Sequence, residues 1–368
     1  QEAKAAGMVE YMLDRLLLTP ARLAAVTADV RHVADLEDPV GRILDGRDLD
    51  CGLRLTRRRV PLGVVATIYE ARPNVTVDIS SLCLKTGNAA ILRGGKETRH
   101  TNLTLTGIIQ QVLLAGDIPL EAVQTITDPD RALLDALLQL EGYVDVLILR
   151  GGAGMQKFCS EHSRIPVICG GTGLCHIFID KSARQDKALP VLSNAKLQRP
   201  SVCNSLETVL IHRDIAAEFI PKMLDYLGSL GASFHPGASA QAYFPTQCPY
   251  PVIPLMENEL EREWLTPDLN VLVVADMEGA LEHIRRYSSG HSDSILTESM
   301  ENAERFIQCV DSAAVYVNSS TRFTDGSEFG LGAEVAISTQ KLHARGPMAL
   351  EALTTYKWIA RGDYNIRQ

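Results

Sequence analysis

Short apolar runs alternate with helical patterns along most of the chain, and this alternation limits the fold more than any other feature. Residues 60–69, 89–92 and 144–149 are apolar enough for buried strands, and residues 75–85 and 101–115 between them have helical spacing. Strands joined through helices pair in parallel, because a parallel pair needs a long crossover connection. The first half of the chain is therefore predicted to form a parallel α/β unit.

The same pattern begins again after about residue 197. Residues 207–211 and 271–274 are predicted strands, and residues 215–230 are a predicted helix. Residues 231–254 are rich in Pro, Ala and Gly, which is typical of a loop or an edge element. A second α/β unit is expected, and a chain of 368 residues is long enough for two domains.

The composition excludes several classes of protein. The net charge of −9 argues against non-specific nucleic-acid binding, and no apolar run reaches the roughly 18–20 residues of a membrane helix. The eight cysteines include no Cys-x-x-Cys pair, and the spacing of His283 and His291 fits no zinc motif, so no metal is expected. A soluble, cytoplasmic protein with mostly reduced cysteines is predicted.

Three turns contain paired glycines, namely Gly94-Gly95, Gly151-Gly152 and Gly170-Gly171. Glycine pairs after strands either make plain turns or let backbone N–H groups approach a phosphate. Arg93 and Lys96 flank the first pair, and two cations at a strand end favour a ribose 2′-phosphate, hence NADP over NAD.

Cys203 is the candidate nucleophile. Basic residues, Lys196 and Arg199, precede it, and positive neighbours lower a thiol pKa toward the reactive thiolate. On these surroundings alone, a buried structural thiol is an equally good interpretation. A cysteine that attacks a carbonyl also needs donors for the oxyanion, and Asn74 has the right side-chain amide after a predicted strand.

The chain resembles the γ-glutamyl phosphate reductases of the aldehyde dehydrogenase superfamily along essentially its whole length. The matching segments are long and polar: Pro61-Leu-Gly-Val, Tyr69-Glu-Ala-Arg-Pro-Asn, Leu84-Lys-Thr-Gly-Asn, Leu92-Arg-Gly-Gly-Lys-Glu, Arg150-Gly-Gly, Gln198-Arg-Pro-Ser-Val-Cys-Asn, Ala280-Leu-Glu-His-Ile, His291-Ser-Asp-Ser-Ile, Ser320-Thr-Arg-Phe-Thr-Asp-Gly, Phe329-Gly-Leu-Gly-Ala-Glu-Val and His343-Ala-Arg-Gly-Pro-Met. The resemblance implies an aldehyde dehydrogenase-like α/β fold of two Rossmann-like domains with a small oligomerisation element.

The resemblance also implies domain bounds. The cofactor-binding domain is expected over residues 1–48 and 61–197, and the catalytic domain over residues 198–329. Residues 49–60 alternate apolar and polar side chains, as a projecting strand does, and with residues 346–368 they resemble assembly elements. A homodimer or a dimer of dimers is expected. Relatives usually begin with a longer helical region, so the chain is expected to be truncated at its start.

Roles carry over from the resemblance position by position. Cys203 matches the catalytic cysteine, and Asn74 matches the oxyanion asparagine. The glycine pair Gly151-Gly152 falls where the cofactor pyrophosphate binds. The adenosine ribose is expected at Arg93, Gly94, Gly95 and Lys96, and the nicotinamide ribose at Glu263, where the alignment is looser.

One departure from the superfamily is informative. Hydrolytic members carry a glutamate two residues before a Gly-Gly pair, where it activates water against the thioester. This chain has Ile168 there, so a thioester on Cys203 is expected to last until hydride or phosphate meets it. The implied reaction is the NADPH-dependent reduction of L-glutamyl 5-phosphate to L-glutamate 5-semialdehyde with release of phosphate, the second step of proline biosynthesis.

Several basic residues are candidate partners for the substrate's carboxylate and phosphoryl groups, namely Arg72, Lys196, Arg199, Arg322 and Arg345. Arg322 is favoured for the carboxylate because polar residues flank it on both sides. Two other functions stay open: an acylating aldehyde dehydrogenase with a different acyl donor, and an inactive homologue that serves as a binding partner, for example of glutamate 5-kinase.

Overall fold

The computed structural model describes residues 7, 13, 16–70 and 73–367, and the chain divides into two compact units. The first unit comprises Gln1–Gly170, Gly330–Ile337 and Pro347–Gln368, and the second comprises Gly171–Phe329 and Ser338–Gly346. The sequence places the division after residue 197, whereas the structure places it at Gly170. The difference is residues 171–197, which contain a strand of the second sheet at residues 175–179 and a helix at residues 185–197 whose apolar side packs in the core of the second unit.

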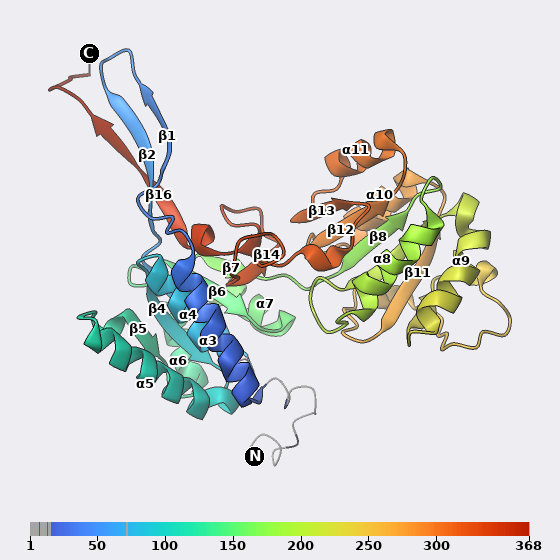
Figure 1. The fold of residues 1–368 in the computed structure, drawn as a ribbon, viewed down its shortest axis with the longest axis horizontal. Helices are drawn as coiled ribbons and strands as arrows, with labels where there is room; N and C mark the ends of the chain where they lie inside the picture. The colour runs from blue at the N-terminus through green and yellow to red at the C-terminus, as the bar shows by residue number, and fades with distance from the viewer. Residues whose placement is uncertain (1–6, 8–12, 14–15, 71–72, 368) are drawn as a thin grey trace. The chain divides into compact units, whose positions relative to one another are not determined.

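A five-stranded parallel sheet with the order β5-β4-β3-β6-β7 forms the centre of the first unit (Figure 1). The chain runs outward from β3 through β4 to β5 and then returns to the other side of β3 with β6. The topological switch point therefore lies between β3 and β6. The strands are β3 (Val64–Tyr69), β4 (Ala89–Gly94), β5 (Val123–Thr125), β6 (Val146–Arg150) and β7 (Val167–Cys169).

Helices cover this sheet. Helix α4 contacts both α3 and α5, and α6 contacts α7 (Figure 1). The buried side chains of Ala66 and Ile68 pack in one core with α6 and α7, while the Tyr69 hydroxyl bonds to Thr76 of α4 at 2.6 Å. Alternate residues of β3 thus serve opposite faces. The helices are α3 (Pro20–Asp35), α4 (Asn74–Lys85), η1 (Lys96–Thr98), α5 (Arg99–Ala115), η2 (Leu120–Ala122), α6 (Arg131–Leu138), α7 (Ala153–His162) and η6 (Leu350–Leu353).

The predicted strand over residues 60–69 is wrong in one respect, because it is two strands in two sheets. Strand β2 (Arg54–Pro61) ends before Gly63, whose φ of +123° lies in a region that favours glycine, and β3 begins at Val64. Strand β2 pairs antiparallel with β1 (Ile43–Asp48) and with β16 (Thr354–Arg361). Residues 54–61 and 354–361, far apart in sequence, therefore share one three-stranded sheet, and the predicted strand over residues 49–60 begins only at Arg54.

The second unit has a six-stranded parallel sheet with the order β10-β11-β9-β8-β12-β13, which confirms the predicted α/β class. Both faces of this sheet are covered, because Ile177 and Ile179 of β8 pack with α8 and α9, and Phe178 packs with α10 and α11. The strands are β8 (Cys175–Ile179), β9 (Leu206–His212), β10 (Ser233–Pro236), β11 (Asp268–Val274), β12 (Ser292–Leu296) and β13 (Ala314–Val317). The helices are α8 (Gln185–Leu197), α9 (Arg213–Gly228), η3 (Gln241–Tyr243), η4 (Glu257–Glu259), α10 (Met277–Tyr287), α11 (Met300–Cys309) and η5 (Thr321–Phe323).

A short two-stranded sheet of β14 (Ala336–Ser338) and β15 (Gly346–Met348) completes the architecture. Of the helices in the described ranges, none combines the length and the apolar character that a membrane crossing requires.

Candidate active site

The candidate residues of the second unit gather at the amino-terminal edge of its sheet. Gly173 precedes β8, Cys203 precedes β9, Glu263 precedes β11, and His291 precedes β12. All of these strands are parallel, so their preceding loops meet at one edge. Ligands of open α/β sheets more often bind at the opposite, carboxyl edge.

The carboxyl edge of the second sheet is occupied by a satisfied polar cluster. At the switch point between β8 and β12, the Asp180 carboxylate accepts hydrogen bonds from Ser182, Thr297 and Asn302 at 2.5, 2.8 and 3.1 Å. Burial raises the pKa of Asp180, but these hydrogen bonds outweigh it and hold the pKa below its usual value. The carboxylate at this switch point thus has its hydrogen-bond partners within the protein.

Cys203 lies half-buried in the turn between α8 and β9, and two neighbours fix its backbone. A side chain at Gly173 would stand 1.6 Å from the Cys203 carbonyl oxygen, so only glycine lets the two loops meet. The Cys175 thiol donates to the same carbonyl at 3.3 Å. Burial raises the pKa of Cys175 well above its usual value, so it stays a neutral donor.

Arg322 is held next to the Cys203 turn. Its guanidinium donates to the side-chain oxygens of Gln198, at 3.1 Å, and of Asn204, the residue after the cysteine. The Asn204 amide in turn donates to the carbonyl of Thr324 at 2.9 Å. Burial lowers the pKa of Arg322, the charge of Arg199 lowers it further, and Cys203 raises it. Arg322 thus lies within electrostatic reach of both the candidate nucleophile and a second cation, Arg199.

Lys196 was predicted as a substrate ligand, but its ammonium has a partner inside the protein. It donates to Glu207 of β9 at 3.1 Å, and both side chains are almost fully buried, with relative exposures of 0% and 2%. Burial lowers the pKa of Lys196, and burial raises the pKa of Glu207 to about 8. Lys196 therefore stabilises the unit from within, and its contact with substrate stays an untested prediction.

Glu263 connects this ion pair to the cysteine loop. Its carboxylate accepts from the Gly173 N–H at 3.1 Å, and the next residue, Trp264, donates its N–H to Glu207 at 3.3 Å. Burial raises the pKa of Glu263, whereas Gly173 and Lys196 lower it. Sequence reasoning missed Glu207, Asn204 and Cys175, although all three lie within a few residues of strand starts that it did predict.

Asn74 is the first residue of α4 and follows β3 at the carboxyl edge of the first sheet. It is exposed, as an oxyanion donor must be, and it belongs to the first unit whereas Cys203 belongs to the second. Its oxyanion role therefore stays a prediction. Arg72, predicted to contact substrate, lies outside the described residues.

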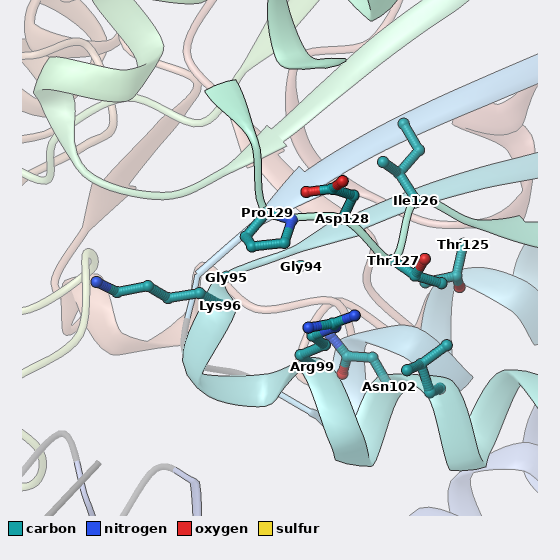
Figure 2. A pocket seen from close by; sticks show the side chains of 11 residues that line it. Gly94, Gly95, Lys96, Arg99, Asn102, Thr125, Ile126, Thr127, Asp128 and Pro129 are labelled. Carbon is teal, nitrogen blue, oxygen red and sulfur yellow. The ribbon is translucent and has the colours of Figure 1, made fainter. Parts of the chain in front are cut away.

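The Gly94-Gly95 turn borders a hollow at the carboxyl ends of β4 and β5. The hollow is partly open to solvent, and Lys96, Arg99 and Asp128 line it together with uncharged residues. Figure 2 shows Asp128 and Pro129 across the glycine turn from Arg99 and Asn102, with Lys96 extending outward from the turn.

Arg93 does not line this hollow. Its guanidinium donates to the carbonyls of Pro129 and Asp130 at 3.3 and 2.9 Å, which fixes the loop after β5. Burial lowers the pKa of Arg93, and Asp128 and Asp130 raise it. Lys96 and Arg99 are the cations that face the hollow, and Arg99 was not among the predicted residues.

Gly151 and Gly152 follow β6 at the switch point of the first sheet and precede α7. The Gly152 N–H donates to the carboxylate of Glu70 at 3.0 Å. Positive helix N-termini attract anions, and here a carboxylate of the chain itself takes that place.

Comparison with known proteins bears on these sites. The model of the aldehyde dehydrogenase family matches residues 30–240. Gamma-glutamyl phosphate reductase of Serratia proteamaculans is 59% identical over 367 residues, which cover 100% of this chain and 88% of that protein. The chain belongs to the aldehyde dehydrogenase family, among its γ-glutamyl phosphate reductases.

Solved structures agree with this assignment. The crystal structure of gamma-glutamyl phosphate reductase from Thermotoga maritima is 42% identical, with a TM-score of 0.96 over 100% of this chain and 87% of that one. Glyceraldehyde-3-phosphate dehydrogenase from Methanocaldococcus jannaschii, solved with NADP, is 15% identical with a TM-score of 0.66 over 93% and 79%, and shares the fold. The chain is thus an oxidoreductase of a family that uses NAD or NADP.

Proposed function

We propose that the protein reduces L-glutamyl 5-phosphate to L-glutamate 5-semialdehyde with NADPH and releases phosphate, as the second step of proline biosynthesis. The observation that carries the proposal is the 59% identity, over the whole chain, to a protein named gamma-glutamyl phosphate reductase. The arrangement around Cys203 supports it, because a half-buried thiol lies within reach of the positive charge of Arg322.

In this proposal the Cys203 thiolate attacks the acyl carbon of the substrate, and the C–O bond to phosphate breaks. The phosphate leaves with the bonding electron pair, and a thioester remains on Cys203. Asn74 and the Cys203 N–H donate to the oxyanion of each tetrahedral intermediate. Arg322 and Arg199 are the proposed anion partners, joined by Arg72, and their charges favour both the thiolate and the anionic substrate. When bound, NADPH supplies the hydride that brings the thioester to the aldehyde level.

The cofactor is proposed to bind mainly to the first unit. The adenosine moiety is proposed to bind beside Gly94 and Gly95, where the charges of Lys96 and Arg99 suit a 2′-phosphate. Arg93 shapes this site through the loop after β5. The pyrophosphate is proposed to bind at Gly151-Gly152, where it would replace the Glu70 carboxylate as acceptor of the Gly152 N–H. The nicotinamide ribose is proposed to bind Glu263, whose carboxylate would give up its hydrogen bond from the Gly173 N–H.

Ile168 supports reduction over hydrolysis. It lies on β7 with 2% relative exposure, and its hydrocarbon side chain cannot remove a proton from water. A thioester on Cys203 would therefore persist for hydride transfer, or for attack by phosphate in the reverse direction.

We further propose that the protein is cytoplasmic and works beside a glutamate 5-kinase, because the acyl phosphate substrate hydrolyses readily in water.

We also propose a homo-oligomer, with the sheet of β1, β2 and β16 as its assembly element. Tyr356 and Trp358 of β16 are half exposed, and the Arg57 guanidinium lies over both rings at 4.7 and 5.7 Å. Exposed aromatic and arginine side chains of this kind are typical of interfaces.

The decisive test couples NADPH oxidation to glutamate 5-kinase, ATP and glutamate, with wild type and Cys203→Ser compared side by side. Wild type should oxidise NADPH only when the kinase is active, and Cys203→Ser should lose nearly all of this rate. Equal rates would overturn the thioester mechanism. In the reverse direction, semialdehyde oxidation that requires CoA in place of phosphate would favour an acylating dehydrogenase instead.

A further inference from the structure

The carboxamide of Asn74 has a charged partner one helical turn away. Asn74 and Asp78 stand four residues apart on α4, and the Asn74 Nδ2 donates to the Asp78 carboxylate at 2.9 Å. Side chains at this spacing lie on the same helical face. The two residues are unequal in burial, because Asn74 is exposed while Asp78 is only partly accessible.

We infer that Asp78 is a positioning residue, whose ionised carboxylate fixes the Asn74 carboxamide with a free N–H directed away from α4. The reason is the chemistry of the two groups. An ionised carboxylate only accepts hydrogen bonds, so it selects the nitrogen of the amide and not the oxygen. One N–H of Nδ2 is then used by Asp78, and the second is left for an oxyanion. The inference rests on the proposed oxyanion role of Asn74.

A protonated Asp78 would lose this selectivity, since its O–H can donate to the amide oxygen and turn that oxygen toward itself. Burial raises the pKa of Asp78 to about 6, and the Asn74 hydrogen bond lowers it. The charged groups that face the carboxyl are Asp29 of α3, which raises the pKa, and Arg150 at the end of β6, which lowers it. Turnover should therefore fall as the pH drops through about 6.

The test compares kcat for NADPH oxidation in a double-mutant cycle of Asn74→Ala and Asp78→Ala. Loss of an oxyanion donor costs about 100- to 1000-fold in kcat. A misdirected donor should cost on the order of 10- to 100-fold, so Asp78→Ala should lower kcat by that factor with the KM for NADPH unchanged. In the Asn74→Ala background, Asp78→Ala should have no further effect, because the group that it positions is gone.

Asp78→Asn separates the charge from the shape. Because an amide at this position can also donate to the Asn74 oxygen, the variant should have a lowered kcat at all pH values, with no further loss near pH 6. Its melting temperature should not fall, since the substitution removes a carboxylate that burial disfavours. Asp29→Asn is the matched control. Its kcat above the pKa of Asp78 should equal that of wild type. Its loss of activity should occur at lower pH, because Asp29 raises the pKa of Asp78.

The outcomes separate the two hypotheses. A wild-type rate in Asn74→Ala would overturn the oxyanion role, and the inference about Asp78 would fall with it. If Asn74→Ala is crippled as expected, two results would overturn only the inference about Asp78. The first is an Asp78→Ala loss of kcat that is equal in both backgrounds. The second is an Asp78→Asn enzyme whose activity still falls near pH 6 as in wild type.

Discussion

Replacement of Lys196 by Met should destabilise the second unit strongly, because it removes one half of a buried ion pair. At the 3.1 Å separation of Lys196 and Glu207, and with an effective dielectric constant of about 20, the attraction is roughly 5 kcal/mol. Desolvation of the two ions offsets most of it in the intact pair, but the single variant leaves Glu207 buried without a cation. The expected cost is about 3–5 kcal/mol, which corresponds to a drop in melting temperature on the order of 10 °C.

The loss should depend on pH in a defined direction. Lys196 lowers the pKa of Glu207, which burial has raised to about 8, so the variant raises it further. An unfolded glutamate ionises near pH 4.3. The folded variant therefore binds a proton more tightly than the unfolded chain does, and its stability falls as the pH rises from about 4 through the folded pKa. Wild-type Glu207 follows the same slope up to its own pKa of about 8, so the deficit relative to wild type should stay constant between about pH 5 and 7 and grow above about pH 8.

Thermal denaturation of Lys196→Met, Glu207→Met and the double variant measures this. Two well-packed apolar side chains can replace a buried pair at little cost, so the double variant should melt within a few degrees of wild type. Losses that simply add would refute the reasoning. The stabilised double variant also tests the substrate role predicted for Lys196. We expect its KM for the acyl phosphate to stay within about threefold of wild type, since less than 1 kcal/mol is then lost, and a much higher KM would restore that role.

Three other changes have defined outcomes. Lys96→Ala should raise the KM for NADPH by roughly 10-fold or more and leave that for NADH nearly unchanged in steady-state assays, because only NADPH offers a 2′-phosphate to the charge. Cys175→Ser should keep most of the activity, because serine keeps the hydrogen bond to the Cys203 carbonyl. Cys175→Ala loses this bond and should lower kcat several-fold, while iodoacetamide still alkylates Cys203. Trp358→Ser should shift the protein toward monomers in light scattering, because it removes an exposed ring from the proposed assembly element.

Most of the fold could be predicted because the strands are continuous apolar runs. The helix over residues 75–85 and the strand over residues 144–149 were predicted within two residues of α4 and β6. The break at Gly63 could not be, since an apolar run that passes from one sheet to another has the same composition as one long strand. Helix α8 was missed whereas α9 was predicted, although each contains an internal proline, Pro190 and Pro221.

The missed helix explains why Lys196 was predicted to contact the substrate. On α8, Lys196 stands four residues after Leu192 and eight after Ala188, and all three are buried on one face. Nearness to Cys203 along the sequence suggested a substrate contact, whereas helical spacing directs the side chain inward to Glu207. The contact between Asn74 and Asp78 was not predicted, because the predicted helix began at residue 75, one residue after Asn74.

The three paired-glycine turns show where sequence reasoning stops. Beside Gly94 and Gly95 there is a hollow lined by Lys96 and Arg99. At Gly152 the N–H is already taken by Glu70, so a pyrophosphate must displace a carboxylate to bind there. At Gly173, just after the third pair, the absent side chain makes room for the Cys203 carbonyl. The same local pattern thus borders a hollow, binds a carboxylate and makes a backbone contact, and in the last two cases the partner that decides it lies at least 30 residues away.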